Sequence, residues 1–293
     1  MTAPAYPIVR VSARRVWDSR GRPTVEAEVH LPGGVLGRAT APAGASTGRG
    51  EAHDLRDGGD AFGGYDVTRA VRQVRDVVDP ALRGLDVSDQ AGLDRVLIDL
   101  DGTPDKRRLG GNACIAVSMA ALHAAAGAAR QPLWRYLLGE EPALLPLPEI
   151  QIFGGGAHAG RRVDVQDFMV MAVGAGSFAE ALDWTAEVYR AAGARMAEAG
   201  RLQGVADEGG WWAAFDTNEE DLSVLVRAIE DSGRVPGDEI AISLDVAASE
   251  LYRDGRYHLG LERRAVDGDG LGDLLTGWID RHPLVSLQDP LAA

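Results

Sequence analysis

The sequence predicts an α/β protein with two parts, an α+β domain over residues 1–140 and a partial TIM-type (β/α) barrel over residues 141–293. In the first part, strand-like alternation comes before helical periodicity, which is typical of an α+β domain. In the second part, short apolar runs alternate with amphipathic segments, which is typical of parallel strands with helices outside. A closed barrel takes about 250 residues, and only 149 residues follow position 144. We therefore expect roughly five strand–helix units, in an open sheet or an incomplete barrel.

The α+β domain begins with three predicted strands joined by turns rich in glycine and proline. These strands are residues 9–16, 24–31 and 34–41. Because the connections are short, neighbouring strands should pair antiparallel. Three helices with 3.6-residue periodicity are predicted next, at residues 67–79, 88–100 and 112–129. The proline-rich stretch 141–148 is expected to link the two domains or to lead into the first barrel strand.

The barrel part is predicted from five short apolar runs bounded by turn residues. These runs are residues 149–153, 165–172, 202–206, 240–244 and 284–287. Amphipathic helices are predicted between the later runs, at residues 177–199, 218–231 and 271–281. Strands and helices that alternate in this way indicate a parallel sheet with its helices on the outside.

Composition excludes several classes of partner and compartment. Acidic residues outnumber basic ones by 44 to 30, giving a net charge of −14. Nucleic acid and anionic membranes are therefore not expected partners, because both require clustered positive charge. The single cysteine, Cys114, precludes an internal disulfide and fits a reducing compartment. Residues 1–11 lack the apolar region of a secretory signal, and the alanine-rich stretch 119–129 is shorter than the ~18 apolar residues of a membrane span. We expect a cytoplasmic protein.

A carboxylate or its amide follows three successive predicted strands. The residues are Asp207-Glu208, Asp245 and Gln288-Asp289. Functional groups of parallel α/β folds gather at the carboxyl ends of strands, so these side chains should converge. Oxygen ligands arranged in this way suit a hard cation such as Mg²⁺. Acids after strands also cap the next helix, but three in succession favour a cation site.

Two flexible loops add candidate ligand-binding groups. Residues 154–160 form a glycine- and alanine-rich loop around His158, which could close over a ligand. A lone histidine in such a loop is more often without a catalytic role. Residues 43–48 form a second flexible loop, which carries hydroxyl groups.

Five segments in this order resemble the enolase family along essentially the whole chain. They are DSRGRPTVE at 18–26, GASTG at 44–48, DLDGT at 99–103, DEGG at 207–210 and LDVAASE at 244–250. The resemblance implies an N-terminal capping domain, a C-terminal barrel and a homodimer. It also implies Mg²⁺-dependent interconversion of 2-phosphoglycerate and phosphoenolpyruvate, with a small anionic substrate.

The resemblance also implies roles for individual residues. Asp245 and Gln288 would hold the first metal ion, and Ser46 would reach a second one. Glu208 would help to expel the hydroxyl as water, with Asp167 as its acidic partner. The side chains of His158 and Gln166 would line the substrate site.

The sequence departs from the family's pattern in ways that bear on activity. The family's barrel continues beyond position 293, with a third metal carboxylate, the lysine base and a His-Arg-Ser substrate clamp. The only lysine of this chain, Lys106, lies in the capping domain, so we expect that this chain alone does not abstract the proton. Gln288 stands where the family has a glutamate ligand, and Asp167 replaces a glutamate. A glutamine offers an oxygen but lacks the negative charge.

Two other functions remain open from the sequence. Arg161 and Arg162 follow the glycine-rich loop and would suit a more anionic substrate, as in the enolase-like carboxyphosphonoenolpyruvate synthases of phosphonate antibiotic pathways. A non-catalytic role is the second alternative. The chain could be an inactive partner that dimerises through its capping domain, or one part of a split enzyme whose barrel a second chain completes.

Overall fold

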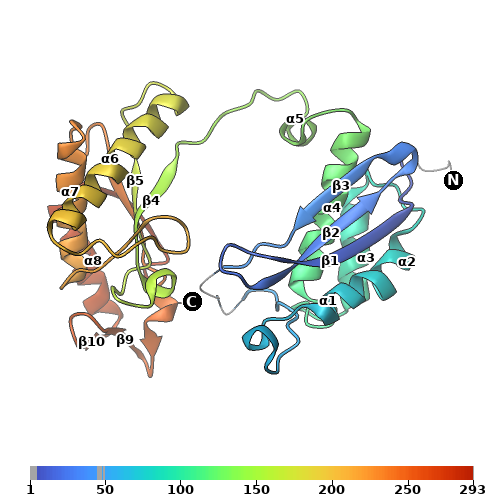
Figure 1. Ribbon diagram of the computed structural model, residues 1–293, viewed down its shortest axis with the longest axis horizontal. Helices are drawn as coiled ribbons and strands as arrows, with labels where there is room; N and C mark the ends of the chain where they lie inside the picture. Colours follow the sequence, from blue (N-terminus) through green and yellow to red (C-terminus); the bar gives the residue numbers. More distant parts are fainter. Residues whose placement is uncertain (1–4, 45–47, 49, 293) are drawn as a thin grey trace. The chain divides into compact units, whose positions relative to one another are not determined.

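The computed structural model describes residues 5–44, 48 and 50–292, and the chain divides into two compact units (Figure 1). The N-terminal unit comprises residues 1–144 and the C-terminal unit residues 145–293. Each unit buries a hydrophobic core of its own. The first is a sheet-plus-helix domain, and the second is a mixed sheet with helices that does not close into a barrel, so the predicted fold class is confirmed.

An antiparallel meander forms the sheet of the N-terminal unit, as the alternation of its sequence predicts. Its strands are β1 (Arg10–Trp17), β2 (Pro23–His30) and β3 (Leu36–Thr40). Helix α4 (Gly111–Ala128) packs on β2 and β3. It is long and apolar enough to cross a membrane by length and composition, but half of it is buried in this unit, as in a core helix.

Shorter helices complete the N-terminal unit. They are α1 (Thr68–Gln73), the π-helical turn η3 (Val74–Val78), α2 (Asp79–Leu82), α3 (Gln90–Asp101) and α5 (Leu133–Leu138), with 3₁₀ turns η1 (Pro32–Gly34) and η2 (Ala61–Gly64). The helix predicted at 67–79 is thus interrupted by a π turn. Pro80, at the start of α2, has no N–H to donate to the carbonyl four residues earlier, which accounts for the irregular hydrogen bonding there.

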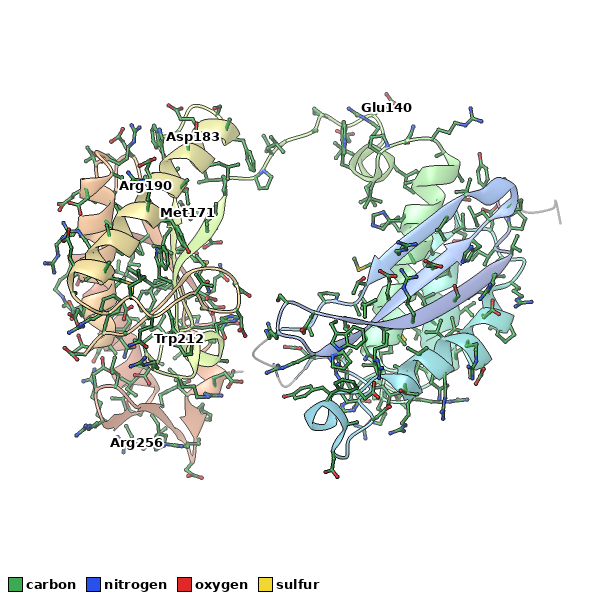
Figure 2. All side chains as sticks on the ribbon, in the orientation of Figure 1. Glu140, Met171, Asp183, Arg190, Trp212 and Arg256 are labelled. Atoms are coloured by element: carbon green, nitrogen blue, oxygen red, sulfur yellow. The ribbon has the colours of Figure 1, made fainter. Side chains whose placement is uncertain are left out.

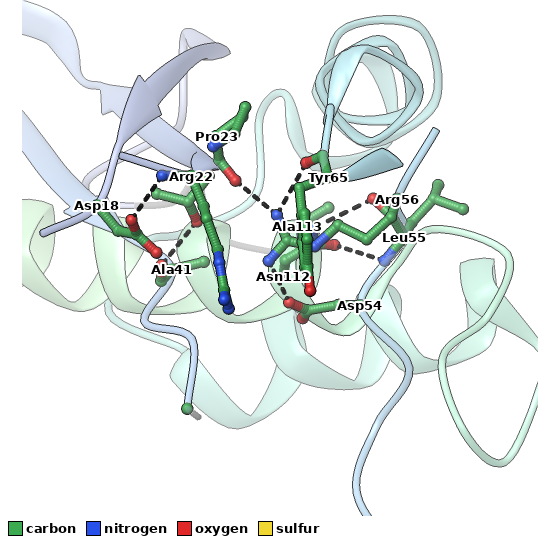
Figure 3. Close-up of polar contacts among 12 residues, drawn as sticks. Asp18, Arg22, Pro23, Ala41, Asp54, Leu55, Arg56, Tyr65, Asn112 and Ala113 are labelled. Carbon is green, nitrogen blue, oxygen red and sulfur yellow. Dashed lines mark hydrogen bonds and ion pairs between the residues drawn. The ribbon is translucent and has the colours of Figure 1, made fainter. Parts of the chain in front are cut away.

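Side-chain hydrogen bonds fix the irregular chain after β3 (Figure 3). Arg56 donates to the carbonyls of Pro23 and Tyr65 at 2.5 and 3.2 Å and pairs with Asp54 at 2.7 Å. The buried Asn112, in the first turn of α4, accepts from the Leu55 N–H at 3.1 Å and donates back to its carbonyl at 3.3 Å. These side-chain hydrogen bonds satisfy backbone groups that have no neighbouring strand to pair with in this segment.

The sheet of the C-terminal unit has mixed strand directions. Its strands are β4 (Glu149–Gly154), β5 (Asp167–Met171), β6 (Trp211–Trp212), β7 (Ala241–Asp245) and β11 (Leu284–Gln288), and their spatial order is β11-β7-β5-β4-β6. Strand β5 is antiparallel to both β4 and β7, whereas β11 pairs parallel with β7 and β6 parallel with β4. The prediction of an all-parallel sheet is wrong, because the connection from β4 to β5, residues 155–166, contains no α-helix to cross over the sheet.

The prediction of a strand at residues 202–206 is also wrong. Only Val205 makes an isolated bridge, to Trp211, and β6 is the two-residue strand that follows. Leu202 and Val205 are exposed, so their apolar character does not reflect a buried strand.

Helices α6 (Phe178–Glu198), α7 (Asn218–Asp231) and α8 (Gly268–Arg281) cover one face of the five-stranded sheet (Figure 1). Each begins at a predicted boundary or within three residues of it, after a side chain that caps a backbone N–H: Ser177, Thr217 and Asp267. The residues that face these helices are apolar and form the core, among them Phe168, Val170, Ile242 and Leu244.

A small antiparallel sheet lies apart from the main one. Its strands are β8 (Tyr252–Arg253), β9 (Arg256–Leu259) and β10 (Arg264–Val266), and the sequence analysis did not predict it. The 3₁₀ turn η5 (Ala248–Glu250) precedes it, and another 3₁₀ turn, η4 (Gly156–Ala159), follows β4.

Candidate active site

The face of the C-terminal sheet opposite the helices carries polar side chains in register. Asp167 of β5 is the neighbour of Asp245 of β7, and Asp245 is the neighbour of Gln288 of β11. Asp167 begins a strand whereas the other two end strands, but β5 runs in the opposite direction, so all three lie at one edge. Neighbouring strands are ~4.8 Å apart, which places these side chains side by side on one face.

His158 is held in this region by a turn that only glycine permits. The Gly155 N–H donates to the Gln166 carbonyl at 2.7 Å, and the Gly156 N–H donates to the Val163 carbonyl at 3.0 Å. A Cβ atom on Gly155 would lie 2.3 Å from the Val165 carbonyl oxygen, so a larger residue would separate the two segments. The turn buries His158, rather than leaving it in an open loop as the sequence predicts.

Gln166 connects the two carboxylates of the site. Its side-chain NH₂ donates to Asp167 Oδ2 at 3.3 Å and to Asp245 Oδ2 at 3.1 Å. Asp167 Oδ1 accepts a hydrogen bond from a second side-chain amide, the NH₂ group of Gln151 on β4. The other oxygen of Asp245 accepts the Ala247 N–H at 2.9 Å. Amide donors thus fix the orientation of both carboxylates.

Glu208 approaches the same place from a turn rather than from the end of a strand. Its Oε1 lies 3.6 Å from His158 Nε2, and Asp167 Oδ2 lies 3.7 Å from the same nitrogen. The donor atoms of these three residues all lie within 4.8 Å of one another. The Glu208 side chain is 53% exposed whereas those of His158 and Asp167 are buried, so Glu208 is the member accessible to a ligand.

Two tryptophans hold the turn of Glu208. Trp212, labelled in Figure 2, donates its indole N–H to the Ala159 carbonyl at 2.7 Å, which ties β6 to the turn of His158. Trp211 stacks on Tyr189 of α6, with ring centroids 4.6 Å apart, and Gly193 leaves room for its ring. The Gly210 N–H donates to Gln151 Oε1 at 2.8 Å. The fixed turn keeps the Glu208 carboxylate next to His158.

The electrostatics of the site favour a bound cation or a ligand with donors. Burial raises the pKa of the Asp245 carboxyl above its usual value, and the charges of Asp167 and Asp289 raise it further. His158 Nδ1 and Gln166 Oε1 are buried without a hydrogen-bond partner among the residues that the structure describes. Buried polar atoms of this kind normally have a partner, such as water or a ligand.

A hydrogen-bond network around the buried Asn218 holds the segment that leads into Gln166. Asn218, at the start of α7, donates its NH₂ to Asp164 Oδ2 at 2.8 Å and to Glu262 Oε2 at 2.7 Å. Asn218 Oδ1 accepts the Asp164 N–H at 2.8 Å. The fully buried Asn218 therefore fixes the backbone two residues before Gln166.

The structure brings together five of the seven residues assigned to the site, and a sixth lies beside them. The five are His158, Gln166, Asp167, Glu208 and Asp245. Gln288 lies beside Asp245 on β11, but its side chain donates to Glu149 Oε2 at 3.1 Å. Ser46 lies outside the described residues.

The sequence analysis missed Gln151 and Glu149, both on β4. The signal was available, because polar residues at 149 and 151 alternate with isoleucines at 150 and 152, which places both polar side chains on one face of the strand. The more anionic substrate that Arg161 and Arg162 would suit stays a prediction. Arg161 pairs with Glu250, and Arg162 donates to Gln203.

An α+β domain followed by a mixed sheet that carries helices on one face and acidic residues at one edge is the layout of a two-domain protein with a partial α/β barrel. Residues 8–137 match the family model "Enolase, N-terminal domain", and residues 142–293 match "Enolase, C-terminal TIM barrel domain". The chain therefore belongs to the enolase family.

Proposed function

We propose that this chain is an enolase-like, Mg²⁺-dependent lyase component that interconverts 2-phosphoglycerate and phosphoenolpyruvate. One observation carries the proposal. His158, the adjacent pair Gln166 and Asp167, Glu208 and Asp245 come from four separate segments. They meet at one edge of the sheet, linked by the Gln166 amide and by contacts of 3.6 and 3.7 Å around His158. These are the positions that the family resemblance assigns to acid–base chemistry, substrate and metal.

The dehydration breaks a C–H bond next to the carboxylate and the C–O bond of the hydroxyl, and forms a C=C bond. The departing hydroxyl needs a proton to leave as water. Glu208 is the exposed carboxyl of the cluster and is suited to donate that proton. Asp167 and His158, buried beside it, would orient Glu208, which in the reverse direction would accept the proton of the attacking water.

A divalent cation fits the donors on the neighbouring strands. Asp245 and Gln288 offer oxygen atoms at adjacent strand ends, which is the donor chemistry that Mg²⁺ prefers. When bound, Mg²⁺ stabilises the negative charge that develops on the substrate as the proton leaves.

The base that removes the proton is the group that this chain does not offer. Its only lysine, Lys106, belongs to the N-terminal unit and donates to the Thr103 carbonyl at 3.2 Å. We therefore propose that further barrel strands, which a second copy of these 293 residues would not provide, supply the base.

Substrate binding by the 293-residue chain tests the site without requiring the base. We expect calorimetry to detect 2-phosphoglycerate binding that depends on Mg²⁺, and Asp245→Asn to weaken it at least tenfold. Asp280→Asn, an exposed change on α8, is the matched control. Absence of binding, or equal binding by Asp245→Asn, would contradict the proposal.

Turnover tests the completed assembly. The native mass of the protein shows whether species above 31.0 kDa are present. We expect phosphoenolpyruvate formation only from preparations with a lysine-bearing barrel segment, and Glu208→Gln should lower the rate roughly 10²- to 10⁴-fold, as for loss of a general acid.

A further inference from the structure

Glu149 occupies the first position of β4, on the polar face of the sheet. Both of its oxygens have partners. The Ser243 hydroxyl donates to Oε1, and the Gln288 NH₂ donates to Oε2 at 3.1 Å. Ser243 is fully buried on β7, two residues before Asp245, so the two side chains share one face of the strand. Glu149 thus contacts a residue of β7 and a residue of β11.

The chemistry of the two side chains dictates how the Gln288 amide is oriented. An ionised carboxylate only accepts hydrogen bonds, so the end of Gln288 that faces Glu149 must be the NH₂ group. The amide oxygen then points away from Glu149. Without such a partner, an amide next to Asp245 would turn its NH₂ toward that carboxylate and would present a donor to a cation.

The same contact places a negative charge beside the amide. Gln288 is the strand neighbour of Asp245, and the Asp245 carboxylate already accepts from Gln166 and Ala247. A glutamine at position 288 supplies an oxygen but no charge. The carboxylate of Glu149, hydrogen-bonded to that amide, supplies the charge from behind Gln288.

We propose that Glu149 is a positioning residue that holds the oxygen of Gln288 toward a divalent cation beside Asp245 and replaces the charge that glutamine lacks. This inference rests on the metal site of the proposed function. It adds a partner of the ligand rather than another ligand, and residues of this kind orient metal ligands and raise metal affinity.

Binding of Mn²⁺ to the 293-residue chain, followed by the electron paramagnetic resonance of the free ion and by competition with Mg²⁺, tests the proposal without activity. Glu149→Gln should weaken Mn²⁺ binding about 10- to 100-fold, as is usual when a partner of a metal ligand is lost. The exposed Glu140 (Figure 2) provides the control Glu140→Gln, which should bind as the wild type does. Circular dichroism checks that each variant folds.

Exchanging the two side chains separates the orientation effect from simple loss of charge. In the double variant Glu149→Gln/Gln288→Glu, the introduced amide donates to the introduced carboxylate, which keeps one oxygen for the cation. We expect Mn²⁺ affinity to return at least to the wild-type value. Gln288→Glu alone places two carboxylates together, so it should lower the melting temperature without metal and show a larger Mn²⁺-induced increase than the wild type.

The outcomes distinguish the two levels of inference. Wild-type binding that Glu149→Gln leaves unchanged would overturn the role of Glu149 and leave the metal site intact. A double variant as weak as Glu149→Gln would also overturn it. No Mn²⁺ binding by the wild type would overturn the metal site of the proposed function, and the role of Glu149 with it.

Discussion

Asp221 is an acidic residue buried inside the C-terminal unit, with no ion pair among the residues that the structure describes. It lies in the first turn of α7, it is fully buried, and neither oxygen has a hydrogen-bond partner among the residues that the structure describes. Burial raises the pKa of Asp221 well above its usual value, and the charges of Glu220 and Glu262 raise it further. The folded protein therefore favours the protonated, neutral side chain.

This shift has a defined effect on stability. In the unfolded chain Asp221 ionises near pH ~3.9, but in the folded chain it ionises only at a higher pH. Unfolding therefore releases a proton between these two values, so this group lowers stability as pH rises from about 4 through the folded-state pKa. Asp221→Asn removes the ionisation and keeps the shape.

We expect Asp221→Asn to gain stability relative to the wild type as pH rises from 5 to 8, measured as the urea midpoint of the C-terminal unit. Glu230→Gln, an exposed change on the same helix, should show no such trend. If the urea midpoint changed equally with pH in the wild type and in Asp221→Asn, Asp221 would not be an acid whose ionisation is disfavoured by burial.

Individual residues of the site could be predicted only partly from the sequence. Asp245 was predicted from its place after an apolar strand, and that strand is β7. Glu208 was assigned to the end of a strand that does not exist, and its actual position depends on Gln151 and on the packing of Trp211. Those contacts join segments distant in sequence, so no local pattern contains them.

At the scale of elements, β3 and α4 pack with their backbones close together in the N-terminal unit. Gly37 of β3 has no side chain, and a Cβ atom there would lie 2.1 Å from the Ala120 carbonyl oxygen and 2.2 Å from the Ala124 nitrogen. Both are backbone atoms of a helix, so they cannot move without shifting α4. The glycine sets the distance between the sheet and its main helix.

Gly37→Ala should therefore destabilise the N-terminal unit by about 3 kcal/mol or more, in the range of severe overpacking. In Gly127→Ala, within α4, the added Cβ atom would lie 3.4 Å from a methyl carbon of Val35, which is an ordinary contact. This variant should be neutral, or more stable by up to ~1 kcal/mol because alanine favours the helix more than glycine does. Urea unfolding of both variants checks the difference. Similar losses for the two would mean that α4 can move away from β3.

Local sequence also contained signals for elements that we did not predict. Asp254 and Gly255 join β8 to β9, and both have positive φ, as in the Asp-Gly turns of tight hairpins. The antiparallel pairing of β4 and β5 follows from a connection without a helix. The strands and helices with strong periodicity were predicted to within a few residues, because burial of one face is a local property of sequence.

At the scale of the whole molecule, the chain contains two hydrophobic cores in two compact units. A unit with its own core can unfold as a cooperative unit. Substitutions in one core should then affect mainly the unfolding of that unit.

We expect calorimetry to resolve two unfolding transitions. Leu222→Ala, in the core of the C-terminal unit, should lower only one of them, since removing a buried leucine costs about 2–5 kcal/mol. Gly37→Ala should lower only the other. A single transition that both variants shift equally would mean that the units unfold together.

The hydrogen bond from Trp212 to the turn of His158 gives the site an optical reporter. An indole whose N–H is bonded to the Ala159 carbonyl emits according to the polarity and geometry of that turn. A ligand that reorganises the turn should change the tryptophan emission, and the change should disappear in Trp212→Phe. Occupancy of the site could thus be followed by intrinsic fluorescence, before the natural substrate is identified and without any label.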